Sequence, residues 1–341
     1  MFYNFNMFIF SSLLILSLMI GLNSMSMICI WLSMEVNMMS FIPVILFLNN
    51  YYNFCSMKYF LVQSFSSSLV LFLMMNLYYM KMMDFMMLML ILMVFMKLGM
   101  FPFQLWYLNM LKDLDWMSGF LLMTIQKILP FYLLNCIFEI NSFNNFGSLL
   151  FTLNNLYLMI ILLQMSISIM IYSNNSIKFF MGVSSLNHMN WLVLLLYMDT
   201  GLWMCYYLFY TQIIMNLIMV FKYYNCNFFN DMYMINSFKM KIFIFFLIFM
   251  LMMMPPFIGF FLKMFSIDLF IYFNMYFLTY LLLLLSIFMS YYYLNMVMSS
   301  MLFNNNNLIN NMTIMINSKK NLYYLLLIMN LFMVLFYWMM N

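Results

Sequence analysis

The chain has 341 residues, of which 68% are hydrophobic and 6% are charged, and its formal net charge is +4. Soluble domains carry about a quarter charged residues, so this composition excludes a soluble protein and predicts a membrane protein with several spans. No long polar stretch interrupts the sequence, so we expect one transmembrane domain over residues 1–341.

The composition also indicates the origin of the sequence. It contains 51 methionines but no arginine and no alanine, although alanine is the best helix former. GC-rich codons are therefore under-used, and methionine stands where isoleucine would serve. This bias is typical of an AT-rich animal mitochondrial genome with an altered methionine code.

A membrane span needs about 20 apolar residues, and on that rule the sequence predicts eleven helices. The N-terminal stretch has no basic region and no cleavage site, so we interpret it as the first span and not as a signal peptide. The expected spans are 2–22, 24–48, 55–78, 84–108, 119–139, 147–172, 178–198, 200–222, 238–272, 274–298 and 321–340.

The fourth and ninth of these spans each combine an apolar run with proline and lysine. Pro102 follows Lys97 closely, and Lys263 follows Pro255 and Pro256. Proline removes a helix donor and clashes one turn back, so we expect both helices to be discontinuous. Broken backbone at membrane depth survives only where protein or water satisfies the freed groups.

The positions of the two breaks indicate an internal repeat. Two five-helix units are possible, over 2–139 and 147–298, with 321–340 as an additional C-terminal helix. An odd number of helices in each unit would invert the second unit relative to the first, as in many ion transporters.

The placement of lysines predicts the orientation in the membrane. Positively charged loops stay on the side of synthesis. Loops after odd-numbered spans hold one lysine, Lys81, whereas loops after even-numbered spans hold seven. We therefore expect the N-terminus on the matrix side and the C-terminus on the intermembrane-space side. The seven lysines are Lys112, Lys178, Lys222, Lys239, Lys241, Lys319 and Lys320.

Five residues inside the spans are candidates for a proton relay: Glu35, Lys97, Lys127, His188 and Lys263. A lysine near the middle of a bilayer costs about 2.5–3.5 kcal/mol on insertion scales, so such residues are rarely present without a function. An amine in a partly hydrated cavity can gain and release a proton, and a nearby carboxylate controls how readily it does so. Glu35 and Lys97 are the natural pair, because both lie mid-span in the first unit.

Each candidate also has a purely structural interpretation. The three lysines could form structural ion pairs, and Glu35 could be a simple charge partner. His188 could be a satisfied histidine in a packed polar cluster instead of part of a water-lined relay.

No motif in the sequence provides a site for a redox cofactor or a metal. The chain lacks GxGxxG, GxxxxGK[ST] and HExxH, and its five cysteines show no CxxC or metal-ligand spacing. We expect no directly bound cofactor. If the chain belongs to a redox enzyme, the electrons should travel in another subunit.

Several short motifs occur in the order found in one family. With these motifs the chain resembles the subunit 2 family of mitochondrial NADH:ubiquinone oxidoreductase (respiratory complex I), one of its antiporter-like membrane families. The motifs are Met34-Glu35-Val36-Asn37, Lys58-Tyr59-Phe60-Leu61, Lys97-Leu98-Gly99, Gln126-Lys127-Ile128 and Pro255-Pro256-Phe257 with Lys263.

The resemblance implies an all-α fold with eleven helices and a discontinuous helix in each half. Glu35 and Lys97 would form the acid–lysine pair, Lys127 would be the central relay, and Lys263 would lie on the second broken helix. Gln104 departs from the family, in which histidine is common after Pro-Phe.

The resemblance further implies a core membrane subunit of complex I in the mitochondrial inner membrane, coupling quinone reduction to proton pumping. NADH, FMN, iron–sulfur clusters and ubiquinone would be bound by other subunits. The expected partners are neighbouring antiporter-like and other membrane subunits, accessory subunits and phospholipids, without nucleic acid.

Two other classes of function remain open from the residues. A stand-alone cation/proton antiporter would share broken helices and buried charge, but it would more naturally carry several mid-span carboxylates, and Glu35 alone fits that description. A structural scaffold would use the buried charges only to pair helices.

Overall fold

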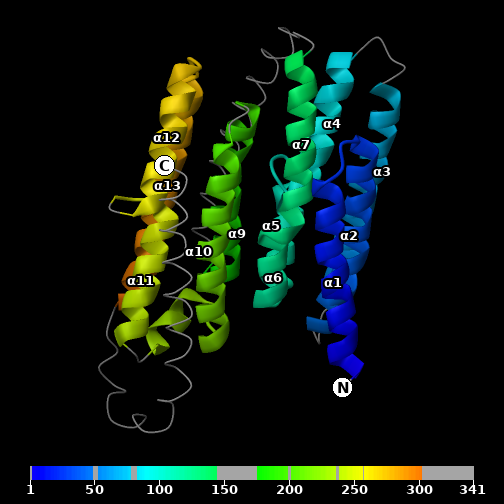
Figure 1. Ribbon diagram of the computed structural model, residues 1–341. Helices are drawn as coiled ribbons and strands as arrows, with labels where there is room; N and C mark the ends of the chain where they lie inside the picture. The colour runs from blue at the N-terminus through cyan, green and yellow to red at the C-terminus, as the bar shows by residue number, and fades with distance from the viewer. Residues whose placement is uncertain are drawn as a thin grey trace. The chain divides into compact units, whose positions relative to one another are not determined.

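The described chain is almost entirely helical (Figure 1). Its backbone N–H and C=O groups have no water partners in a membrane, so helices form even where the residues have modest helix propensity. The expected spans 147–172 and 321–340 lie outside the described residues. The computed structural model describes residues 2–48, 53–77, 83–143, 175–198, 201–235, 238–255 and 257–301.

The chain divides into two compact units. The first comprises residues 1–200 and 280–285, and the second comprises residues 201–279 and 286–341.

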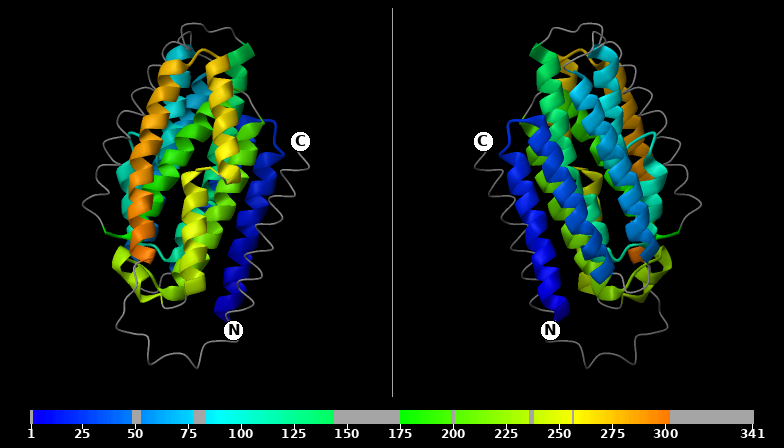
Figure 2. Two further views of the ribbon diagram at one scale, coloured as in Figure 1. Left: turned by 90° about the vertical axis from the view of Figure 1, so that its left-hand side faces the viewer. Right: turned by 90° about the vertical axis from the view of Figure 1, so that its right-hand side faces the viewer.

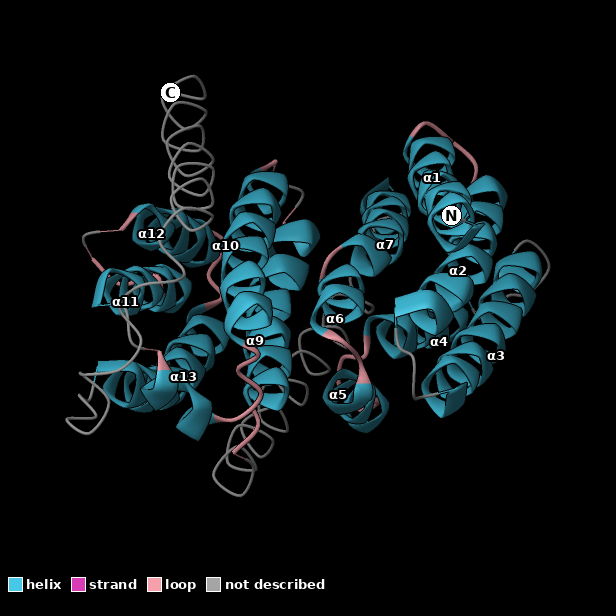
Figure 3. Ribbon diagram, turned by 90° about the horizontal axis from the view of Figure 1, so that it is seen from below, coloured by secondary structure: helices cyan, strands magenta, loops and turns pink. Residues whose placement is uncertain are grey.

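In the first unit, α1, α2, α3 and α4 pack side by side in chain order (Figure 3). Helix α7 packs against α1, α2, α4, α6 and α9, and α9 also contacts α5 and α6. The helices are α1 (Phe2–Leu22), α2 (Met27–Leu48), α3 (Asn53–Leu77), α4 (Met83–Leu98), α5 (Gln104–Asp113), α6 (Trp116–Met123), α7 (Ile125–Phe143) and α9 (Ile177–Tyr197).

In the second unit, α10 packs against α11 and α12, which also contact each other. Figure 2 shows α12 following α11 after a short turn. The elements are α10 (Leu202–Tyr224), the 3-10 helix η2 (Phe229–Met234), α11 (Phe238–Met252), α12 (Ile258–Tyr272) and α13 (Tyr276–Met301).

Several helices have the length and composition of membrane spans. Within the described part of the chain there are seven: Phe5–Leu22, Met27–Leu48, Phe54–Leu77, Trp116–Glu139, Ile177–Tyr197, Leu202–Tyr224 and Tyr276–Met298. Shorter apolar helices cover Phe85–Leu98 and Met240–Met252. The expected polytopic membrane protein is confirmed.

One expected span has an interruption that the sequence did not predict. The region 119–139 is formed by two helices, α6 and α7, which meet at Thr124. Thr124 has φ −121° and ψ −85°, outside the helical region. Its backbone N–H and its hydroxyl both donate to the Phe120 carbonyl, at 3.0 and 2.8 Å, so the side chain adds a second bond at the end of α6.

The end of α4 is a Schellman motif. Gly99 has φ +69° and donates its N–H to the Met96 carbonyl at 3.2 Å. Met100 donates to the Phe95 carbonyl at 2.9 Å. Glycine suits this left-handed position, and the helix stops after Leu98 because the chain turns here.

The end of α11 uses the same left-handed turn with a different residue. Met253 has φ +54° and donates its N–H to the Met250 carbonyl at 3.1 Å. Helix α12 then begins at Ile258. Helices α4 and α11 are therefore each followed by a residue in the left-handed conformation.

We predict that Gly99→Ala destabilises the protein. A left-handed backbone costs an L-residue about 1–2 kcal/mol, and a Cβ at position 99 would lie 2.6 Å from Tyr107 Cβ. The thermal midpoint of the purified protein in detergent should fall by several degrees.

Gly119→Ala is the matched control. A Cβ there meets Leu111 Cδ2 at an ordinary 3.7 Å, and alanine favours the helix interior. The midpoint should stay constant or rise, and equal losses in the two variants would contradict this explanation of the α4 turn.

Candidate functional site

Lys97 lies in the last turn of α4, and two side chains from other helices donate to backbone carbonyls of this turn. Gln63 Nε2 of α3 donates to the Lys97 carbonyl at 3.2 Å, and Trp106 Nε1 of α5 donates to the Met96 carbonyl at 3.2 Å. The end of α4 is therefore satisfied by protein groups while Lys97 remains 92% buried, with 8% of its surface exposed.

The Lys97 ammonium group is influenced by Glu35 on α2. Their charges interact, and the Glu35 charge also acts on Tyr59 of α3. The two residues do not form a direct ion pair, and Glu35 Oε1 is buried without a hydrogen-bond partner. The expected acid and lysine are thus brought into one electrostatic neighbourhood but are not in contact.

A row of neutral polar side chains connects α2, α3 and α7 next to this pair. The Tyr59 hydroxyl donates to Gln126 Oε1 at 2.9 Å. Gln126 Nε2 donates to Asn37 Oδ1 at 3.1 Å. Since Gln126 directly precedes Lys127, these bonds hold the first turn of α7 against the two neighbouring helices.

Lys127 extends from α7 toward α5 and α9 and is only 2% exposed. Its Nζ donates to Ser185 Oγ of α9 at 3.3 Å. It also lies 4.5 Å from the ring centroid of Tyr107 on α5, within the range of a cation–π interaction. The Tyr107 hydroxyl is 2.7 Å from the same Ser185 oxygen.

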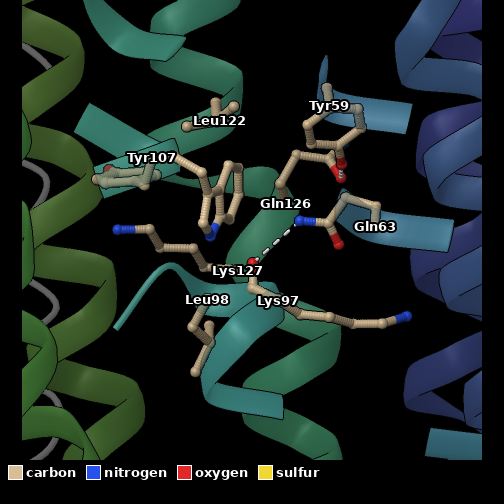
Figure 4. Close-up of a pocket in the computed structure, with 9 residues that line it drawn as sticks. Tyr59, Gln63, Lys97, Leu98, Tyr107, Leu122, Gln126 and Lys127 are labelled. Atoms are coloured by element: carbon tan, nitrogen blue, oxygen red, sulfur yellow. Dashed lines mark hydrogen bonds between the residues drawn. The ribbon is translucent and has the colours of Figure 1, made fainter. Parts of the chain in front are cut away.

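Lys97 and Lys127 line one small cavity, but their ammonium groups point in opposite directions (Figure 4). The space open to the centre of a water molecule is about 10 Å³, close to the smallest volume that can hold one water. The lining residues are Tyr59, Gln63, Lys97, Leu98, Trp106, Tyr107, Leu122, Gln126 and Lys127.

Lys263 belongs to the second unit and reaches back to the end of the preceding helix. Its Nζ, on α12, donates to the Met252 carbonyl at the end of α11 at 3.1 Å. A cation at a helix C-terminus is favoured by the helix dipole. Lys263 therefore satisfies a carbonyl at its break, as Gln63 does at the end of α4.

His188 is 1% exposed and lies on α9, in which all residues from Phe179 to Leu196 are buried. It follows Ser185 by one turn. The structure thus places His188 on the same helix as the Lys127 partner.

Two lysines outside the candidate set lie at the edges of the spans. Lys58 forms an ion pair with Asp113 at 3.9 Å, and its side chain is 60% exposed. Lys178 donates to the Leu114 carbonyl at 2.7 Å. The exposed Lys58–Asp113 pair is worth about 0–1 kcal/mol, which fits a surface anchor.

The sequence analysis did not identify the neutral partners of the two central lysines. Gln63 and Ser185 each lie within an apolar helix and Tyr107 lies on the short helix α5, and each bonds to a candidate lysine or its neighbour. Polar residues inside apolar runs are the signal that could have found them. Among the described residues, no three His, Cys, Asp or Glu side chains gather as a metal site.

Comparison with known sequences and structures gives consistent results. A chain from Anopheles gambiae named NADH-ubiquinone oxidoreductase chain 2 is 31% identical over 265 residues, covering 74% of this chain and 73% of the relative. The chain of the same name from Rhipicephalus sanguineus is also 31% identical, with 78% and 81% covered.

Two solved structures share the fold. A chain of respiratory complex I from Thermus thermophilus with bound Aureothin superposes with a TM-score of 0.74 at 13% identity, over 88% of this chain and 71% of that chain. A chain of the membrane-bound sulfane sulfur reductase, an archaeal respiratory membrane complex, gives a TM-score of 0.78 at 13% identity, with 95% and 70% covered.

The transmembrane family described as NADH:quinone oxidoreductase/Mrp antiporter matches residues 24–289. This match covers most of the chain and includes every candidate residue. The chain therefore belongs to the NADH:quinone oxidoreductase/Mrp antiporter family of transmembrane proteins.

Proposed function

We propose that this chain is the antiporter-like, proton-translocating core membrane subunit of an NADH:ubiquinone oxidoreductase. The observation that carries the proposal is the pair of buried lysines, Lys97 and Lys127, which line one small cavity beside the end of α4. Buried amines at membrane depth are costly, and a proton path is the function that requires them.

The chain would act as part of an enzyme without performing electron transfer itself. Relatives at 31% identity carry the name NADH-ubiquinone oxidoreductase chain 2, which supports a place beside other membrane subunits, including further antiporter-like ones, accessory subunits and phospholipids. NADH, FMN, iron–sulfur clusters and ubiquinone would be bound in other subunits, and quinone reduction there would drive the protons.

The proposed architecture has eleven helices, in two inverted five-helix repeats over 2–139 and 147–298 and a C-terminal helix over 321–340. The similar ends of α4 and α11 support it: each is followed by a left-handed residue, and a side chain from another helix takes up a carbonyl there. Each pair of helices, α4 with α5 and α11 with α12, would then form one discontinuous span.

The proposed location is the mitochondrial inner membrane, with the N-terminus in the matrix and the C-terminus in the intermembrane space. The asymmetric distribution of the eight loop lysines, seven after even-numbered spans and one after an odd-numbered span, supports this orientation.

In the proposed mechanism, the charge on Glu35 controls whether Lys97 keeps its proton. The neutral side chains beside the cavity, with water in it, would connect Lys97 to Lys127 on the opposite side. The proton would continue by way of His188 and Lys263 or leave the subunit. Each side chain on this path has a protonation state in which it is neutral or hydrogen-bonded. This limits the free-energy cost of moving a positive charge through a medium of low dielectric.

Two other functions make different demands on the chain. A stand-alone cation/proton antiporter should work after purification as a single chain, and the names of the relatives favour the complex. A structural scaffold should keep pumping after neutralisation of both Lys97 and Lys263.

We predict that Lys97→Met leaves the complex assembled but strongly reduces NADH-driven proton pumping. Methionine keeps the apolar stem and adds no buried polar group, and the Lys97 carbonyl bond to Gln63 is a backbone feature that survives. Pumping is measured with a pH-sensitive dye in proteoliposomes containing the intact complex.

Lys58→Met is the matched control, because it makes the same chemical change at an exposed lysine. It should pump at the wild-type rate. Normal activity and proton stoichiometry in Lys97→Met would count against the proposed function.

We further predict that the effects of Glu35→Gln and Lys97→Met are not additive. If Glu35 acts through Lys97, the loss of the acid has no further consequence once the amine is gone. The double variant should pump as fast as Lys97→Met alone, measured in the same proteoliposomes. A double variant whose loss equals the product of the two single losses would show that the residues act independently.

A further inference from the structure

The surroundings of Lys127 differ from those of Lys97. Lys97 interacts with a carboxylate, Glu35. The contacts of Lys127 are a hydroxyl and an aromatic ring, contributed by Ser185 of α9 and Tyr107 of α5. Both partners are fully buried.

The hydrogen bonds of Ser185 use its whole bonding capacity. A serine hydroxyl has one donor and two acceptor positions. Ser185 donates to the Gly182 carbonyl at 2.6 Å, so the bond to Tyr107 at 2.7 Å must run from the phenol to Ser185 Oγ. The second acceptor position receives Lys127 Nζ at 3.3 Å. This arrangement fits a charged Lys127, which can only donate.

A neutral amine needs the opposite arrangement, because its nitrogen has a lone pair that accepts a hydrogen bond. Ser185 can supply that bond by turning its O–H from the Gly182 carbonyl toward Lys127. Gly182 loses little, because its carbonyl also belongs to the helix ladder of α9. A single rotation of one hydroxyl therefore serves both protonation states of Lys127.

We propose that Ser185 and Tyr107 are positioning residues that set how tightly Lys127 holds its proton, with the Ser185 hydroxyl turning as Lys127 gains or releases it. This inference rests on the proposed function, in which Lys127 carries a proton. No proton passes through Ser185 or Tyr107 in this scheme, and each keeps its own hydrogen.

The two parts of Tyr107 have opposite effects. Its ring, 4.5 Å from Nζ, favours the charged amine. Its hydroxyl donates to the same Ser185 oxygen, which makes that oxygen a weaker acceptor for Lys127 and makes the Ser185 O–H a better donor, because linked hydrogen bonds strengthen one another. The hydroxyl therefore favours the neutral amine. The short distance between α5 and α9, where a Cβ at Gly182 would meet Leu108 Cδ2 at 2.9 Å, keeps both parts in place.

Other charged or ionisable groups lie around α7. Helices α1 and α6 carry no acidic or basic residue. The described acidic, basic and histidine side chains on α7 itself and on the other helices packed against it are Glu35, Lys97, Glu139, Lys178 and His188, and α5, which supplies Tyr107, carries Lys112 and Asp113. Because these groups are the same in every variant below, only differences between variants report on Lys127.

The test is the pH profile of NADH-driven proton pumping by the intact complex in proteoliposomes. Pumping that needs a charged Lys127 falls as the pH rises. The pH at which the pumping rate has fallen to half its maximum is compared between variants. Ser185→Ala removes the acceptor of the charged amine, a stronger bond than the one lost by the neutral amine. The fall should move to lower pH by about one unit.

Tyr107→Phe keeps the ring and removes the competing hydroxyl, so the fall should move to higher pH. Opposite shifts are not expected from a loss of packing. If Ser185→Ala fails to assemble, Tyr107→Phe alone decides the question: a shift to higher pH supports the proposal, and a wild-type profile or a shift to lower pH overturns it.

Ser184→Ala is the matched control. Ser184 is as buried as Ser185 and makes the same type of bond, from Oγ to the Met181 carbonyl at 2.8 Å. Its profile should match the wild type. Coinciding profiles for Ser184→Ala and Ser185→Ala would overturn the proposal.

Lys127→Met separates this inference from the proposed function. If that variant pumps normally, the role of Lys127 in the proposed function fails. If it stops pumping while Ser185→Ala and Tyr107→Phe keep the wild-type profile, only the inference about the two positioning residues fails.

Discussion

The structure depends on one constraint: a backbone carbonyl released at a helix end inside a membrane needs a donor from the protein. At the end of α4 the donor for the Lys97 carbonyl is the amide of Gln63. At the end of α11 the donor for the Met252 carbonyl is the ammonium group of Lys263. Because a neutral side chain serves the first break, the Lys97 ammonium group remains available for other interactions, whereas Lys263 already has a structural bond.

The positions of the helix breaks could be predicted from sequence only where a strong local signal exists. Proline lies near Lys97 and near Lys263, and α4 and α11 end in these two regions. The exact end of α4 follows from Gly99, which accepts a positive φ. The break at Thr124 has no proline and no adjacent glycine. Its conformation depends on how α6 and α7 pack against other helices, and this information is not local.

The candidate site shows the same division between local and non-local information. Charged residues stand out in a membrane sequence because each one is costly, and Lys97 and Lys127 do line one cavity. Ser185 and Gln63 did not stand out, because hydroxyl and amide groups cost much less and occur on many spans. Their role depends on contacts between α7 and α9 and between α3 and α4. The periodicity of the sequence does not specify the geometry of these contacts.

The different partners of the two lysines give the proposed module a direction. In the proposed mechanism the proton affinity of Lys97 would depend on the charge of Glu35, because in a medium of low dielectric an electrostatic effect extends beyond direct contact. The neutral partners of Lys127 carry no charge that a distant event could change. In this proposal a change at Glu35 would therefore act mainly on Lys97 and would alter the difference in proton affinity between two amines on opposite sides of one cavity. A proton moves toward the amine that holds it more tightly, so control of one affinity at a time is sufficient to reverse the preferred side.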